Sequence, residues 1–163
     1  VAVTGVQTCA LPIWLCANLM LFYTNKTRNS SMILAAQSAN IVDRTVVLDA
    51  LRELAEEGAR RIAARDFDAF GALLHEGWML KTRLADGISD VVVDELYARA
   101  RDAGALGGKI AGAGGGGFLL LYVPLAVQDA VRSAIGSDLR EMPFRFERDG
   151  TRIVFNSKRD PYY

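Results

Sequence analysis

The segment of this chain best suited to chemistry is a run of glycines in its second half. Residues 107–117 read GGKIAGAGGGG. Each glycine inside such a segment costs up to about 1 kcal/mol of chain entropy relative to alanine, so the run requires a reason. Either the backbone takes positive φ angles at several positions, or another group approaches where no Cβ fits. Successive amides turned inward in such a loop bind anions, notably phosphate. The run therefore predicts a phosphate-handling loop.

The surroundings of this loop separate it from the common nucleotide loops. Gly112, Gly114 and Gly117 formally fit the dinucleotide pattern GxGxxG, but that pattern leads from a strand into a helix. Here the apolar run 118–123 follows the glycines and predicts a strand. The P-loop pattern fails as well, because Lys109 precedes the glycines and no Gly-Lys-Ser/Thr ends them. The alternative is a purely structural hairpin, although two-residue turns suffice for hairpins.

The elements that must position this loop follow from the spacing of apolar residues. Residues 15–24 and 118–123 are continuous apolar runs, which are typical of buried strands. Apolar residues at three- and four-residue steps predict helices over 45–66, over 67–86 with Gly87 as a stop, and over 90–103. A helix capped by Ser30 or Ser31 precedes them, and one over 125–135 follows. Strands 142–147 and 151–156 flank an Asp-Gly turn. The order predicts an α+β fold with about five strands.

Composition excludes several classes of protein. With 19 basic and 19 acidic side chains the chain has no net charge, and nothing attracts it generally to nucleic acid or to anionic membranes. One histidine, His75, and two cysteines are too few for a structural zinc site or a Cys/His catalytic pair. We therefore expect no nucleic-acid or membrane partner and assign no metal ligands, although a metal held by carboxylates or phosphates stays open.

The first residues carry a pattern that is foreign to proteins. Residues 3–13, VTGVQTCALPI, have no charge and no helical or strand period, and read back as codons they look like a sequencing adapter. A secretory signal would need a basic region, which residues 1–13 lack. We expect residues 1–14 to be adapter-derived and residues 15–163 to be a C-terminal piece of a longer protein. If Cys9 is foreign, Cys16 alone remains, which suits a reducing cytoplasm.

Four segments together resemble a known family. Residues 108–118, GKIAGAGGGGF, strongly resemble the third, C-terminal motif of the GHMP small-molecule kinases. Within that superfamily, LFYTNKTR at 21–28, HEGWMLK at 75–81 and PFRF at 143–146 are most similar to the members that phosphorylate D-glycero-D-manno-heptose 7-phosphate. One departure is Asn25, where that pattern has glycine. The resemblance covers about residues 15–156.

The resemblance implies a two-domain enzyme of which residues 15–163 form the C-terminal domain. That domain is ferredoxin-like and α+β, an antiparallel sheet of four to five strands with a helical insertion after the first strand. ATP and Mg²⁺ would be bound mainly by an N-terminal domain against which this one packs, and the catalytic residues are expected there, so none is assigned here. The γ-phosphoryl group of Mg-ATP would pass to the anomeric C1 hydroxyl of the heptose 7-phosphate, mostly through positioning and charge stabilisation. This piece alone is expected to be inactive.

Three groups of residues are candidate contacts for such ligands. The first lines the floor of the cleft and braces the nucleotide loop: Lys109, Gly112, Ala113, Gly114, Gly115, Gly116 and Gly117. The second leads into a helix N-terminus, which favours phosphate, and would hold the phosphate of the sugar: Lys26, Thr27, Arg28 and Ser30. The third has i, i+3, i+6 spacing and would face the sugar: His75, Trp78 and Lys81. The structural alternatives are a helix cap beside solvated cations, a core tryptophan and an exposed lysine. Ser89 and Asp90 are expected to be N-caps.

Two other functions stay open. A kinase for fucose, galactose or an N-acetylhexosamine would share the glycine loop but would not need cations near Arg28. A non-catalytic module would use the same loop to hold a phosphorylated ligand without turnover.

Overall fold

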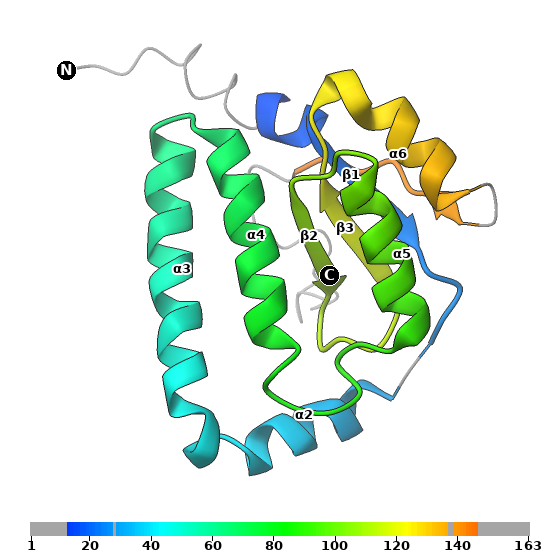
Figure 1. Ribbon diagram of the computed structural model, residues 1–163. Helices are drawn as coiled ribbons and strands as arrows, with labels where there is room; N and C mark the ends of the chain where they lie inside the picture. Colours follow the sequence, from blue (N-terminus) through cyan, green and yellow to red (C-terminus); the bar gives the residue numbers. More distant parts are fainter. Residues whose placement is uncertain (1–12, 28, 137–138, 147–163) are drawn as a thin grey trace, which may run out of the picture.

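The core of the fold is a four-stranded antiparallel sheet. The computed structural model describes residues 13–27, 29–136 and 139–146 (Figure 1). The strand order is β2-β3-β1-β4, which is the order of a ferredoxin-like sheet. The strands are β1 (Leu19–Tyr23), β2 (Gly107–Ala111), β3 (Phe118–Tyr122) and β4 (Arg140–Glu141). The predicted α+β class, with an antiparallel sheet of four to five strands, is confirmed.

The helices fall where the fold class requires them. Those between β1 and β2 are α2 (Ser30–Ala39), α3 (Thr45–Ala63), α4 (Phe67–Lys81) and α5 (Val91–Asp102), with a 3-10 turn at Val42–Arg44. Between β3 and β4 lie a 3-10 turn at Leu125–Val127 and α6 (Gln128–Ile135). The helical insertion after the first strand is therefore confirmed. In the described part of the chain, no helix is both long and apolar enough to cross a membrane.

One face of the sheet carries the hydrophobic core. Met20 pairs with Leu121 and Phe22 with Leu119 across β1 and β3, and all four side chains are buried. Helices α5 and α6 contribute Val93, Ala100, Val131 and Ile135 to the same cluster. Burying a large apolar side chain contributes about 1.5–3 kcal/mol, so this layer holds the central strands in register. The register in turn fixes where the loop between β2 and β3 lies.

Helix α4 lies unusually close to the edge strand β2. A Cβ on Gly107 would come within 2.1 Å of the Gly71 carbonyl oxygen, and a Cβ on Gly71 within 2.5 Å of the Tyr122 ring. Glycine at both positions lets the two backbones approach, and α4 then covers β2, while α3 packs outside α4 (Figure 1). This packing role of Gly71 and Gly107 is not predictable from their positions in the sequence.

Three predicted boundaries are wrong. Residues 13–17 are helical, so the first strand starts at Leu19 instead of residue 15. Asn18 ends that helical turn, because its side-chain amide donates to the Trp14 carbonyl at 2.9 Å. Asn29, rather than Ser30 or Ser31, caps α2, since its carboxamide oxygen accepts from the Ser31 amide. Helix α4 ends at Lys81, before the predicted stop at Gly87.

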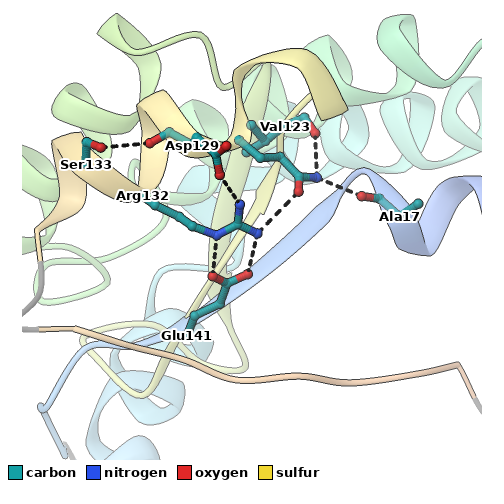
Figure 2. A network of polar contacts seen from close by, with 7 residues as sticks. Ala17, Val123, Asp129, Arg132, Ser133 and Glu141 are labelled. Carbon is teal, nitrogen blue, oxygen red and sulfur yellow. Dashed lines mark hydrogen bonds and ion pairs between the residues drawn. The ribbon is translucent and has the colours of Figure 1, made fainter.

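The strand predicted at 142–147 is displaced. The pairing with β1 occurs at Arg140–Glu141, and residues 142–146 form no strand, although the Met142 amide still donates to Leu21. Figure 2 shows what holds this short strand. Arg132 of α6 donates from two nitrogens to the Glu141 carboxylate, at 2.7 and 3.2 Å, and also to Asp129. The predicted strand at 151–156 lies outside the described residues.

Candidate functional site

The glycine loop between β2 and β3 has a backbone that other residues rarely adopt. Gly112, Gly114, Gly115, Gly116 and Gly117 all have positive φ, between 75° and 150°. Side chains with a Cβ are strained in this region, so the predicted need for positive φ is confirmed.

Close packing is the second reason for glycine in this loop. A Cβ on Gly114 would lie 2.7 Å from the Ile88 carbonyl oxygen and 2.9 Å from the Ile88 Cα. A Cβ on Gly116 would lie 2.9 Å from the Lys26 carbonyl oxygen. Both contacts are with backbone atoms, which cannot turn aside as a side chain would. The loop is therefore pressed against two segments, the turn before α5 and the turn after β1.

Hydrogen bonds fix the loop to the same two segments. The Gly115 amide donates to the Ile88 carbonyl at 2.7 Å, and the Gly117 amide donates to the Lys26 carbonyl at 2.8 Å. The Gly117 carbonyl accepts from both the amide and the hydroxyl of Thr24, which is buried. These two amides thus have acceptors within the protein. A phosphate at this loop would have to bind groups other than these two amides. The prediction that consecutive loop amides point inward to bind an anion therefore does not hold for Gly115 and Gly117.

Lys26 holds the loop in a further way. Its ammonium group contacts both Asp90 carboxylate oxygens, at 2.7 and 2.9 Å, with the two side chains 29% and 20% exposed. Asp90 also caps α5, because the same carboxylate accepts from the Val93 amide, and so the expected capping role of Asp90 is confirmed. The charge of Lys26 is therefore already balanced by a carboxylate. Its phosphate-binding role stays a prediction that would require this ion pair to be exchanged.

The neighbours of Lys26 are less constrained. Thr27 is exposed, and Ser30 is the exposed first residue of α2. Arg28 lies outside the described residues. Asn25 has φ 55°, a conformation that glycine and asparagine adopt most readily. The departure from the family pattern at position 25 therefore keeps the backbone geometry that glycine would give.

The three residues predicted to face a sugar point to different places. His75 Nδ1 lies 2.9 Å from the Tyr97 hydroxyl, and the two rings are stacked. Trp78 is only 2% exposed and packs against the same tyrosine. Lys81 instead donates to the Gly112 carbonyl at the start of the glycine loop. The spacing does not produce one sugar-binding face, and of the three only Lys81 contacts the loop.

Two lysines converge beside the loop. Burial lowers the pKa of Lys81, and the charge of Lys109 on β2 lowers it further. Burial likewise lowers the pKa of His75, with a contribution from Arg101. The proximity of Lys81 to Lys109 was not predicted, because Lys81 fell inside a helix expected to run to residue 86 and nothing in its spacing points to Lys109 on β2. Positive charge therefore gathers where the loop begins.

A groove runs between α3 and α4 and ends at these lysines. We call it the α3–α4 groove; its volume is about 390 Å³. Its walls are largely apolar and include Leu54, Gly58, Phe70, Leu74 and Gly77, and Lys81 and Lys109 also line it. Within the described residues no group of three His, Cys, Asp or Glu side chains could hold a metal ion.

The fold and loop define a class of protein: a ferredoxin-like α+β domain in which a glycine loop joins two strands of the sheet and is hydrogen-bonded to two neighbouring turns. Residues 47–141 match the family described as GHMP kinases C terminal. The chain belongs to this family, and the family predicted from the sequence is confirmed.

Known proteins with similar sequences and structures agree with this assignment. The D-glycero-alpha-D-manno-heptose 7-phosphate kinase of Campylobacter jejuni is 24% identical over 139 residues, which is 83% of this chain and 41% of that protein. The mevalonate kinase of Methanothermobacter thermautotrophicus is 29% identical over 106 residues, 64% of this chain and 33% of that protein. The crystal structure of L. major mevalonate kinase with R-mevalonate superposes with a TM-score of 0.64 at 17% identity, covering 76% of this chain and 40% of that one. The chain thus spans well under half the length of these relatives.

Proposed function

We propose that this chain is the C-terminal domain of an ATP-dependent sugar kinase whose substrate is D-glycero-D-manno-heptose 7-phosphate. The γ-phosphoryl group would pass to the anomeric C1 hydroxyl. The observation that carries the proposal is the glycine loop, held by Lys26, Ile88 and Thr24 within a GHMP kinase C-terminal fold. The heptose is favoured because the similarity to the Campylobacter jejuni enzyme covers 83% of this chain.

The role of the loop in this proposal is positioning. Phosphoryl transfer depends mostly on holding the reactants in line and stabilising charge, so a rigid loop at the floor of the cleft has a direct use. Lys109 and the loop residues would brace the nucleotide-binding half, and ATP with its Mg²⁺ would be bound mainly by that half. The cytoplasm, inferred from the cysteine content, is the proposed location.

A phosphoryl-transfer assay on the complete open reading frame tests the proposal. An independent read of genomic DNA across codon 14 supplies that frame. We expect Mg-ATP-dependent transfer to heptose 7-phosphate, with a new phosphate that is acid-labile, as anomeric phosphates are. Transfer should be slower to galactose, fucose and N-acetylhexosamine. Preference for an unphosphorylated sugar would contradict the substrate, and absence of transfer to any sugar would favour the binding module.

A matched pair of variants connects this activity to the loop. Gly114→Ala should lower kcat, because its Cβ would meet the Ile88 backbone. Arg52→Gln removes an exposed side chain of α3 and should leave activity unchanged. The 163-residue chain by itself should give no turnover, and steady product formation from it would contradict that expectation.

A further inference from the structure

The α3–α4 groove has a composition that the phosphorylation of a sugar does not require. Leu54 and Leu74 line its walls, and Gly58 and Gly77 keep it open because they carry no side chains. A Cβ on Gly77 would meet no atom within 4 Å. The walls offer few hydrogen-bond partners to the hydroxyl groups of a sugar, and unpaired polar groups in an apolar site are costly. The groove therefore suits a hydrocarbon chain or ring.

One end of the groove is charged. Lys81 and Lys109 both line it, and in the described part of the chain neither ammonium group has a carboxylate within ion-pair distance. Among the described residues, the hydrogen bond of the Lys81 ammonium group is the one that it donates to the Gly112 carbonyl. Lys109 lowers the pKa of Lys81, which means that the two positive charges repel each other. An anion between them would relieve this repulsion and make charge-assisted hydrogen bonds to both.

We propose that the α3–α4 groove is a second ligand site, which binds a small amphipathic anion. A phosphate or carboxylate group would lie between Lys81 and Lys109, and an apolar body would lie along the walls formed by α3 and α4. The volume of about 390 Å³ is within the range of small-molecule sites. This site goes beyond the proposed sugar phosphorylation, because its walls are unsuited to a sugar. The ligand would connect to the glycine loop through Lys81, which contacts Gly112.

Isothermal titration of the 163-residue chain with n-octyl phosphate, below its micelle concentration, tests the site. We expect saturable one-to-one binding with a dissociation constant below about 1 mM. Octanoate should also bind, whereas 1-octanol, which lacks the charge, and glucose 6-phosphate, which lacks the apolar chain, should each bind at least about tenfold more weakly. Stronger binding of octyl phosphate than octanoate would assign the site to phosphates, and the reverse to carboxylates.

Two variants probe the two ends of the site separately. Lys109→Gln removes a charge at the head, and Gly77→Leu fills the groove from a position whose Cβ has open space. Each should weaken octyl phosphate binding at least about tenfold, with unchanged far-ultraviolet circular dichroism. Arg52→Gln, a charge removal on an exposed part of α3, should leave the affinity within about twofold.

Several results would overturn the site. They are the absence of saturable octyl phosphate binding, an affinity in both groove variants equal to that of the wild-type chain, and an affinity for 1-octanol equal to that for octyl phosphate. Equal affinity for glucose 6-phosphate would also overturn it and would place a sugar phosphate there instead. Because every readout is binding to this chain, failure here leaves the sugar kinase proposal standing. Failure of the kinase assay likewise does not contradict the proposed ligand site in the groove.

Discussion

Two alanine substitutions in the glycine loop separate backbone strain from close packing. Gly112 has φ 95° with no atom within 4 Å of a Cβ, whereas Gly114 has φ 116° and a Cβ there would lie 2.7 Å from the Ile88 oxygen. Gly112→Ala should cost about 1–3 kcal/mol of unfolding free energy from the unfavourable φ alone. Gly114→Ala adds overpacking against backbone, a further cost of about 1–3 kcal/mol. The entropy that alanine removes from the unfolded chain is the same for both and cancels in the comparison.

Urea unfolding followed by circular dichroism measures this difference. With a denaturant dependence of about 1–3 kcal/mol per molar urea, the midpoint of Gly114→Ala should lie roughly 1 M below that of Gly112→Ala. Both variants should unfold below the wild-type chain. Equal midpoints for the two variants would refute the claim that the loop is pressed against Ile88. A Gly112→Ala midpoint above wild type would refute the assigned strain.

Four further substitutions test other parts of the structure. Gly107→Ala should lower the free energy of unfolding by at least about 2 kcal/mol, because its Cβ would meet the α4 backbone. Gly77→Ala, whose Cβ meets no atom within 4 Å, should raise the free energy of unfolding by up to about 1 kcal/mol. Urea unfolding measures both changes. Asp90→Ala should cost about 1–2 kcal/mol through the lost cap and should speed hydrogen exchange of the loop amides, whereas unchanged exchange would contradict its bracing role. The lowered pKa of His75 means that the unfolded chain binds its proton more readily, so stability should fall as pH drops through and below about 6.5. His75→Gln should flatten the stability profile between pH 7 and 5.5, since it removes the sole histidine; an unchanged slope would contradict the shift.

Much of the fold was predictable because its signals are local. The apolar spacing of α3 and α5 and the uninterrupted apolar run of β3 each report burial directly. The glycine run likewise marked the loop and its positive φ angles correctly. What failed was the position of boundaries such as the start of β1 and the displaced β4. The start of β1 and the position of β4 depend on hydrogen bonds made by the side chains of Asn18 and Arg132. The spacing of apolar residues carries no information about such bonds.

The candidate site was less predictable for a physical reason. Charged and aromatic residues were grouped by spacing along a helix, but their partners come from other elements. Lys26 forms an ion pair with Asp90, and His75 Nδ1 contacts the Tyr97 hydroxyl. In both cases the partner is far away in the sequence. Lys81 and Lys109 line the same groove because α4 packs on β2. That packing requires glycine at positions 71 and 107, where a Cβ would collide with neighbouring atoms. The sequence shows those glycines but does not show which backbone will approach them.

The position of β1 in the sheet has a consequence for how the protein folds. Strands β2 and β3 are neighbours in the sequence, whereas β1 pairs with β3 only after the whole helical insertion has been closed, as in the contact of Leu19 with Tyr122. Non-local pairings form slowly because loop-closure entropy comes first. Pulsed hydrogen exchange during refolding should therefore protect the β2–β3 hairpin before β1. The Gly115 and Gly117 amides of the loop donate to the Ile88 and Lys26 carbonyls, and these turns reach the loop only when β1 and the insertion are in place. The glycine loop is thus among the last parts of the chain to reach its native conformation, and a chain that has not finished folding has no ordered loop.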